Sequence, residues 1–435
     1  MSSGELLDIA AGQKEGKAVG ICSVCSANRF VLEAAMLQGK ADGKVVLIES
    51  TSNQVDQFGG YTGMNPQQFV EYVETIAEEM DFPVEKIILG GDHLGPNAWQ
   101  NEPADSAMTK ARDLIAAYIE AGYTKIHLDT SMRCADDSGD RHTPFDDEIV
   151  AERSAKLCKV AEETYSNKQA GSPAPIYIIG TEVPIPGGAQ EAEKEVVPTS
   201  AEDAERTIAV TKEAFIEKGL ESAWERVIGV VVQPGVEFGD AQVFAYDRQK
   251  ANALSKLIER YERIVYEAHS TDYQSAEALK QMVEDHFSIL KVGPWLTFAL
   301  REAIFALAAM EKEWLGNKGG VNLSDIVETI EEAMVKNPKH WQKHYHGSDD
   351  ELHYCRKYSY SDRVRYYWPQ PEIEKALNLL FENLSQRPVP LTLLSQYMPG
   401  QYHKVRAEKI ANNPVELIRD KIMEVISCYS YACSP

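Results

Sequence analysis

The feature that most constrains the fold is an alternation of short, apolar, β-branched runs with amphipathic stretches rich in helix-forming residues. Eight such runs occur before residue 310: Ala18–Cys22, Val45–Glu49, Lys86–Gly90, Lys125–Asp129, Ile176–Thr181, Val227–Val232, Ile264–Ala268 and Ile289–Gly293. Runs that are apolar nearly throughout, such as VIGVVV, are typical of strands covered on both faces. Because open doubly wound sheets usually stop near about six strands, eight strand–helix units predict a closed (β/α)8 TIM barrel.

The strand signal stops near residue 310, and the rest of the chain has helical patterns such as LSDIVETIEEAMVK and PVELIRDKIMEVI. We therefore expect two units, the barrel over residues 1–310 and an α-helical extension over residues 311–435. The extension contains an aromatic and basic segment, HYCRKYSYSDRVRYYW. We expect it to contribute residues to the barrel mouth or to a subunit interface of a homo-oligomer.

The net charge of the chain limits the classes of partner that we expect it to bind. Among 435 residues, 67 are acidic and 44 are Lys or Arg, which gives a formal net charge of −23. Such a field repels phosphate backbones and anionic lipid, so we expect no nucleic-acid or membrane partner. No apolar run approaches the ~20 residues that span a bilayer, and the N-terminal sequence lacks the basic-then-apolar order of a signal peptide. We expect a cytoplasmic enzyme.

Polar side chains gather where the predicted strands end, and in a TIM barrel the active site is built at those ends. The segment after the second strand carries Asn53 and Gln57, and the segment after the seventh carries Asp272. We expect these three side chains to contact a substrate. For each one the alternative is a buried hydrogen-bonding residue or a loop cap.

His93 and His269, at the ends of the third and seventh predicted strands, are the candidate metal ligands. Neutral imidazole binds Zn²⁺ and neighbouring transition metals, and a strand-end carboxylate such as Glu182 can complete an open site. The alternative is that each histidine is a hydrogen-bonded core residue. The other eight histidines, His127 among them, are weaker candidates. Asp92 could accept a proton from a substrate hydroxyl while a metal polarises a carbonyl, or it could cap the following loop.

Phosphate-binding features are sparse in this sequence. The segment Gly12–Lys17 is one residue short of a P-loop and precedes the first strand, and no G-x-G-x-x-G follows a strand. We therefore expect no nucleotide cofactor. In the extension, Arg363 and Arg365 could bind a substrate phosphate through their guanidinium groups, or they could form a solvated or salt-bridged helix end.

Several long motifs together resemble one family. The runs SNQVDQFGGYTGM, GGDHLGPNAWQ, KIHLDTSM, TEVPIPGG, YEAHSTDYQ and YSDRVRYYW resemble the Z-subunit family of D-tagatose-1,6-bisphosphate aldolase over essentially the whole chain. That family is related to the class II zinc-dependent ketose-bisphosphate aldolases, which are (β/α)8 barrels. Its members have been labelled tagatose-6-phosphate kinases or non-catalytic aldolase subunits, and some act as ketohexose-phosphate 4-epimerases.

The resemblance implies roles for residues on the third, seventh and eighth strands. Asp92 and His93 look like the Asp-His pair of class II aldolases, in which the aspartate transfers a proton and the histidine binds zinc. His269 looks like the last zinc histidine of those enzymes. Lys291 matches a lysine of their phosphate region, which implies a contact with substrate.

The fourth to sixth strands carry further correspondences and one departure. Asp129 and Ser131 resemble the aldolase Asp-x-Ser, and Glu182 matches the strand-five glutamate of those enzymes. On strand six the aldolases supply another zinc histidine, whereas this chain has Gln233. The resemblance therefore implies a metal site of two histidines with Glu182 or Gln233.

Residues and resemblance together predict a metal-dependent enzyme that acts on a phosphorylated ketohexose by retro-aldol chemistry at C3–C4. We expect a divalent metal, Zn²⁺ or else Mn²⁺, Co²⁺ or Ni²⁺, with Asp92, Glu182 and Asp129 as catalytic carboxylates. The outcome would be 4-epimerisation between fructose 6-phosphate and tagatose 6-phosphate, or cleavage of tagatose 1,6-bisphosphate. The alternative is a non-catalytic subunit that stabilises a class II aldolase catalytic subunit.

Overall fold

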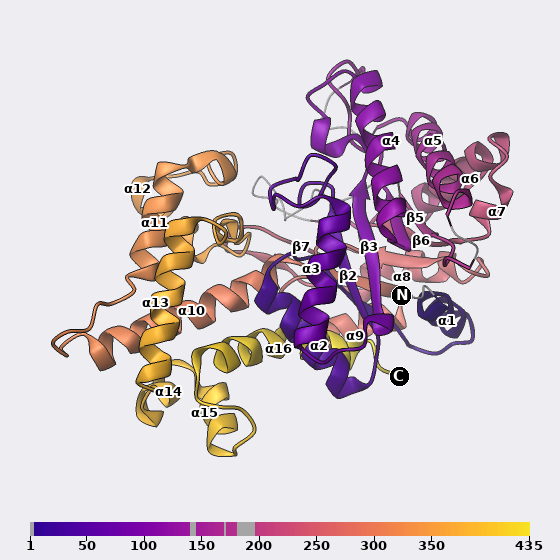
Figure 1. Ribbon diagram of the computed structural model, residues 1–435. Coiled ribbons are helices and arrows are strands. Elements are labelled where there is room, and N and C mark those ends of the chain that lie inside the picture. Colours follow the sequence, from indigo (N-terminus) through magenta and orange to yellow (C-terminus); the bar gives the residue numbers. More distant parts are fainter. Residues whose placement is uncertain (1–3, 140–144, 169–170, 181–195) are drawn as a thin grey trace.

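Eight parallel strands close into a barrel, which confirms the predicted (β/α)8 architecture (Figure 1). The computed structural model describes residues 4–139, 145–168, 171–180 and 196–435. The barrel strands are β1 (Ile21–Val24), β2 (Val46–Thr51), β3 (Ile87–Leu94), β4 (Lys125–Leu128), β5 (Ile176–Ile179), β6 (Val227–Val232), β9 (Val265–Ala268) and β10 (Phe287–Val292). Strands β1 and β10 pair with each other and close the ring.

Two details of the strands differ from the prediction. Strand β3 continues past Gly90, the predicted end of this run, to Leu94. A side chain at Gly90 would place its Cβ 2.6 Å from Cγ of Glu49, so the glycine makes room for a neighbour inside the sheet. In addition, β7 (Glu237–Phe238) and β8 (Val243–Phe244) form a small antiparallel pair after β6.

Helices cover the outside of the barrel. They are α2 (Arg29–Asp42), α3 (Pro66–Glu79), α4 (Ala104–Ala121), α5 (Asp147–Ser166), α6 (Ala201–Glu217), α7 (Glu221–Trp224), α8 (Arg248–Ile258) and α9 (Ala276–Glu284). Asn, Asp or Ser side chains accept N–H groups at the first turns of six of them, α2, α3, α5, α6, α8 and α9. These caps fix where each loop at the carboxyl ends of the strands enters its helix.

The chain leaves the barrel along α10 (Pro294–Leu315) and returns along α16 (Pro414–Ala432) (Figure 1). Between them lie α11 (Ile326–Lys336), η3 (Pro338–His340), α12 (Asp349–Tyr358), η4 (Arg363–Tyr366), α13 (Pro371–Gln386), α14 (Leu391–Tyr397) and α15 (Pro399–Arg406). Helix α16 packs against α2, α9 and α10 and touches β1. The last helix therefore lies among the barrel helices, and the division at residue 310 stays a prediction.

The amino-terminal helix α1 (Gly4–Lys14) contributes to the apolar interior of the barrel. Its Leu6 is 1 % exposed and packs with apolar side chains that point into the barrel, namely Ile21, Leu47, Ile88, Ile176, Ile178, Ile228, Val231 and Ile289. Most of these lie in the first half of their strands. No helix in the described part of the chain is long and apolar enough to cross a membrane.

Candidate functional site

Charged side chains replace apolar ones inside the carboxyl-terminal half of the barrel. Strand β4 places Lys125 and His127 on one face, because successive side chains alternate between the two faces of a strand. Glu49 from β2, Glu267 from β9 and Lys291 from β10 point into the same space, and all five are buried. Lys125 Nζ lies 2.7 Å from Glu49 Oε1 and 2.6 Å from Glu267 Oε2. These contacts reach across the barrel, since β4 is adjacent to neither β2 nor β9.

Asp92 and His93 face the interior together, although they are neighbours on β3. The pairing of β3 with β4 shifts register between Gly91 and Leu94, and His93 has a φ of 49°. A histidine in the left-handed region is strained, and such residues cluster at functional sites. The irregular backbone brings both side chains to the floor of the barrel mouth.

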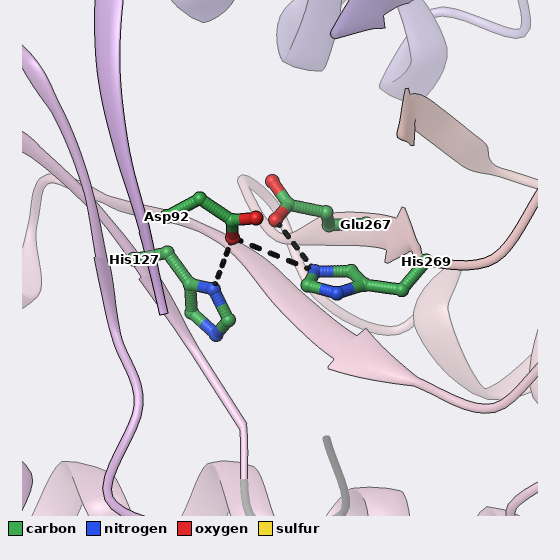
Figure 2. Close-up of side chains that lie close together, drawn as sticks. All are labelled: Asp92, His127, Glu267 and His269. Carbon is green, nitrogen blue, oxygen red and sulfur yellow. Dashed lines mark hydrogen bonds and ion pairs between the residues drawn. The ribbon is translucent and has the colours of Figure 1, made fainter. Parts of the chain in front are cut away.

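Three histidine rings meet at this floor. The ring centroids of His93 and His269 are 4.9 Å apart, and that of His127 lies 5.3 Å from each of them. Each ring has one nitrogen within hydrogen-bond distance of a carboxylate oxygen. His93 Nδ1 lies 2.7 Å from Asp129 Oδ2, and His127 Nδ1 lies 2.8 Å from Asp92 Oδ1. His269 Nε2 lies 3.1 Å from Glu267 Oε1. Figure 2 shows two of these pairs and the position of Asp92 between the rings of His127 and His269.

The donor set and the charge of this cluster fit a divalent metal. Asp92, His127, Glu267 and His269 each offer a ligand atom, and these atoms lie within 4.8 Å of one another. The Nε2 atom of His127 is buried and has no hydrogen-bond partner among the described residues. Around the rings, four buried carboxylates face two buried ammonium groups: Glu49, Asp92, Asp129 and Glu267 against Lys125 and Lys291. With the three histidines neutral, as metal ligands must be, two negative charges are in excess, which a divalent cation would balance.

The charged neighbours keep Asp92 ionised. Burial alone would raise the pKa of Asp92, but the charges of His93 and Lys291 and the hydrogen bond from His127 hold it well below its usual range. Lys291 Nζ lies 2.9 Å from Asp92 Oδ1 and 2.7 Å from Glu49 Oε2. Burial by itself would lower the pKa of Lys291, yet the neighbouring carboxylates raise it well above its usual value.

A cavity of about 420 Å³ opens above this floor. Asp92, His93 and His269 form part of its lining, and Arg365 and Tyr366 from the extension form another part. A volume of this size is typical of a small-molecule site. The extension therefore contributes side chains to the barrel mouth of its own chain.

Two arginines of the extension, Arg363 and Arg365, have no carboxylate partner in the described part of the chain; Arg363 is buried and Arg365 is partly buried. The guanidinium group of Arg365 donates to the carbonyl oxygens of Ser361 and Asp362 and, at 3.0 Å, to the hydroxyl of Tyr366. Arg363 donates to the same hydroxyl at 3.4 Å, lies 2.9 Å from His344 Nδ1, and has a buried Nε without a partner. Buried cations without a counter-ion are costly, so this segment is suited to an anion.

The whole chain matches one family of proteins. The family model described as D-tagatose-1,6-bisphosphate aldolase subunit GatZ/KbaZ-like matches residues 6–434. The chain belongs to this family.

Several solved structures are similar to this chain. The chain is similar to the crystal structure of a probable tagatose 6 phosphate kinase from Sinorhizobium meliloti 1021, with 45% sequence identity, a TM-score of 0.86, and coverage of 95% of this chain and 100% of that one. A putative fructose-1,6-biphosphate aldolase from Coccidioides immitis has 14% identity and a TM-score of 0.43 over 87% of this chain and 97% of that one. A fructose-bisphosphate aldolase from Campylobacter jejuni has 14% identity and a TM-score of 0.42 over 88% of this chain and 95% of that one.

In this GatZ/KbaZ-like chain, many of the residues singled out from the sequence come together. The cavity lining includes Asn53, Asp92, His93, His269, Asp272, Lys291 and Arg365. Asp129 lies behind His93, and Ser131 Oγ donates to Asp129 Oδ1 at 2.7 Å. Lys291 is ion-paired with carboxylates on the cavity floor, whereas the resemblance implied a phosphate contact.

Other predicted residues lie apart from the cavity lining or outside the described residues. Gln57 donates through Nε2 to the carbonyl oxygen of Lys110 at 3.0 Å. Gln233 accepts the N–H groups of Gly235 and Val236 through Oε1, at 2.8 and 3.0 Å. Glu182 falls outside the described residues, so its role stays a prediction.

Four residues of the cluster were not among the site residues predicted from the sequence: Glu49, Lys125, His127 and Glu267. Their signal was present: each is a charged or ionisable residue in a largely apolar run, two positions from another polar residue, in VVLIEST, KIHLD or YEAH. A buried strand tolerates such residues only where they find partners. The partners come from other strands, which a search along one run at a time does not bring together.

Proposed function

We propose that this chain is a metal-dependent enzyme that opens the C3–C4 bond of a phosphorylated ketohexose by retro-aldol chemistry. The proposed outcome is 4-epimerisation between fructose 6-phosphate and tagatose 6-phosphate, or cleavage of tagatose 1,6-bisphosphate. The observation that carries it is the buried Asp92 beside His93 and His269, with Lys291 Nζ 2.9 Å from its carboxylate, on the floor of a cavity bounded by Arg365. The proposed base, the two proposed cation ligands and the proposed anion-binding group thus line a single small-molecule site.

His93 and His269 would hold a divalent cation, Zn²⁺ or else Mn²⁺, Co²⁺ or Ni²⁺. Bound there, the cation would polarise the ketose carbonyl and stabilise the negative charge that develops on oxygen as the carbon–carbon bond opens. Asp129 Oδ2 lies 2.7 Å from His93 Nδ1, and this hydrogen bond orients the ring. In this proposal Asp129 acts through His93.

Asp92 is the proposed base. Its carboxylate takes the proton from the C4 hydroxyl as the C3–C4 bond breaks, which leaves an aldehyde and an enediolate held in the cavity. If the aldehyde turns over and the enediolate attacks its other face, Asp92 returns the proton to the C4 oxygen and the configuration at C4 is inverted. If the aldehyde leaves, the result is cleavage and the enediolate must take up a proton, for which Glu182 is the proposed donor.

Arg365 is the proposed ligand of a substrate phosphate, with Arg363 supporting it through Tyr366. Guanidinium groups present paired N–H donors to phosphate oxygens, and neither arginine is ion-paired with a described carboxylate. Asn53 and Asp272 also line the cavity and would contact the sugar hydroxyl groups. The assignments of Gln57, Ser131 and Lys291 to the substrate have no support from their hydrogen bonds.

The purified protein alone, supplied with a divalent metal and without nucleotide, tests the proposal. Carbon NMR would follow fructose 6-phosphate and tagatose 1,6-bisphosphate in separate samples. Formation of tagatose 6-phosphate identifies an epimerase, and formation of triose phosphates identifies an aldolase. No change in either sugar would contradict the proposal.

The second candidate function is a non-catalytic subunit that stabilises a class II aldolase catalytic subunit. Two observations favour it: the family description names an aldolase subunit, and Gln233 turns its amide oxygen to the backbone at the strand where class II aldolases supply a zinc histidine. An inactive protein that increases the activity or lifetime of a class II catalytic subunit would support this alternative.

A further inference from the structure

We propose that His127 on β4 is the third protein ligand of the cation, together with His93 and His269, and that the adjacent carboxylates accept hydrogen bonds from the three rings. This inference rests on the metal of the proposed function and is independent of the reaction that the metal supports. It assigns to β4 the ligand for which the sequence offered Glu182 or Gln233, the residue that follows β6. The cluster then has three neutral nitrogen ligands and an open position.

The first support is the unpaired nitrogen of His127. Its Nδ1 lies 2.8 Å from Asp92 Oδ1, while its Nε2 is buried and has no partner among the described residues. Leaving a buried polar atom without a partner costs about 1–3 kcal/mol, and native structures seldom leave such atoms unpaired. In Figure 2 the second nitrogen of His127 and that of His269 both lie on the side away from the two carboxylates. A cation bound to His127 Nε2 would supply the partner that this atom lacks.

The second support is the spacing of the rings. Three imidazoles that bind one tetrahedral zinc ion through nitrogens at about 2.1 Å place their ring centroids about 5 Å apart. The observed separations among His93, His127 and His269 are 4.9, 5.3 and 5.3 Å. The three rings therefore have the centroid spacing of such a site.

The third support is that the carboxylates are occupied elsewhere. Asp92 Oδ1 lies 2.9 Å from Lys291 Nζ, and Glu267 Oε2 lies 2.6 Å from Lys125 Nζ. One nitrogen of each ring is also hydrogen-bonded to a carboxylate: that of His93 to Asp129, that of His127 to Asp92 and that of His269 to Glu267. A carboxylate on the far nitrogen of a ligating histidine fixes the ring and its tautomer, which is the usual arrangement around zinc.

Gln233 is a poor alternative because its oxygen is already used. That oxygen accepts two backbone N–H groups in the turn after β6, at 2.8 and 3.0 Å. Turning it to a metal would leave both donors unpaired. Coordination by His127 requires no such loss, and it leaves Asp92 free to act as a base.

Metal binding, measured without any substrate, tests the inference. We would measure the zinc content of the dialysed protein and its affinity in competition with a chromophoric chelator, for the wild type, His127→Gln and Gln233→Ala. We expect about one ion per chain in the wild type, at least a 100-fold loss of affinity in His127→Gln, and wild-type affinity in Gln233→Ala. His286→Gln, which changes a histidine outside the cluster, is the matched control and should bind as the wild type does.

X-ray absorption spectroscopy of the zinc-loaded wild type keeps the inference testable if His127→Gln does not fold. Three imidazole ligands are expected, and two imidazoles with a carboxylate or amide oxygen would overturn it. Wild-type affinity in His127→Gln, or loss of affinity in Gln233→Ala instead, would also overturn it. If three histidines bind the ion but neither sugar phosphate reacts, the inference stands and the proposed reaction falls.

Discussion

At the scale of single residues, Asp92 is the point where the interactions of the barrel floor meet. It receives the backbone N–H of His93 at 3.0 Å, the ring nitrogen of His127 at 2.8 Å and the ammonium group of Lys291 at 2.9 Å. The Sγ atom of Cys25 lies 4.0 Å from its second oxygen. These partners hold one carboxylate in one orientation and in its ionised form, which a general base requires.

Replacing Asp92 by asparagine should remove the base and leave the shape of the site. Asparagine can still accept the hydrogen bond from His127 but cannot take up a proton. We expect kcat for sugar-phosphate turnover to fall by about 10²–10⁴-fold with the cation still bound. The rate is measured by NMR beside Asp105→Asn, a surface control on α4. Undiminished turnover in Asp92→Asn would exclude Asp92 as the base.

Asp272 gives a pH-dependent prediction at the same scale. Burial raises its pKa to about 6, although the N–H groups of Trp295 and Gly293 donate to it at 2.8 and 3.0 Å. The pKa of Asp272 is higher in the folded state than in the unfolded state, so ionisation of this carboxyl group destabilises the fold. Its contribution to the free energy of unfolding is therefore lost as the pH rises from about 4 through 6.

Asp272→Asn keeps the acceptor oxygen and removes the charge. We expect the variant to be more stable than the wild type at pH 7, by on the order of 1–3 kcal/mol, and the difference to vanish near pH 4. Urea unfolding midpoints of both proteins over this range provide the measurement. A difference that is constant with pH would mean that the charge of Asp272 costs nothing in the fold.

At the scale of elements, α16 connects the extension to the active-site end of the barrel. It packs against α2, α9 and α10, and the hydroxyl of Tyr429 donates to the carbonyl oxygen of Thr271 at 2.9 Å. Thr271 lies two residues after His269. The final helix of the chain thus supports the loop that carries a proposed metal ligand, which links the stability of the extension to the geometry of the site.

A cavity in this helix should weaken the whole fold. Ile422 is completely buried within α16, and replacing it by alanine removes packing that the neighbouring helices cannot easily recover. We expect a loss of about 2–5 kcal/mol in the free energy of unfolding. Tyr431→Ala changes a side chain of the same helix that is 57% exposed and should cost far less. Equal unfolding midpoints for the two variants would argue that α16 is peripheral.

At the scale of the whole molecule, negative charge is in excess both in the chain and inside the barrel. The net charge is −23, and the buried cluster has two more carboxylates than ammonium groups. A bound divalent cation would offset the buried excess and stabilise the folded state, because the unfolded chain has no such site.

Removing the metal should therefore lower the thermal unfolding midpoint. At a free-metal concentration of one hundred times Kd, binding stabilises the folded state by about 2.7 kcal/mol. Scanning calorimetry of the protein with a chelator, and after metal is added back, provides the comparison. The midpoint should fall and then recover, whereas magnesium added in the presence of a zinc-selective chelator should not restore it. Identical midpoints with and without metal would exclude a stabilising metal site.

The alternation of apolar strands and amphipathic helices was sufficient to predict the barrel, since period and strand number follow from local sequence. It also placed Asp92, His93 and His269 at strand ends, where residue type and position indicated their chemistry. Helix α16 could not be placed in this way, because an amphipathic pattern shows that a helix has a buried face but not what covers it.

The sequence by itself determined the strand count, the buried faces and the positions at which charged residues interrupt apolar runs. Only the tertiary structure decided which of these charges meet. Closure of the ring brings Lys125 of β4 against Glu267 of β9, strands that are not neighbours in the sheet. The same closure sets His269, which follows β9, beside His93 and His127, and the packing of the extension on the barrel brings Arg365 to the cavity. Distances across a barrel depend on how all eight strands close together, and no local pattern in the chain encodes them.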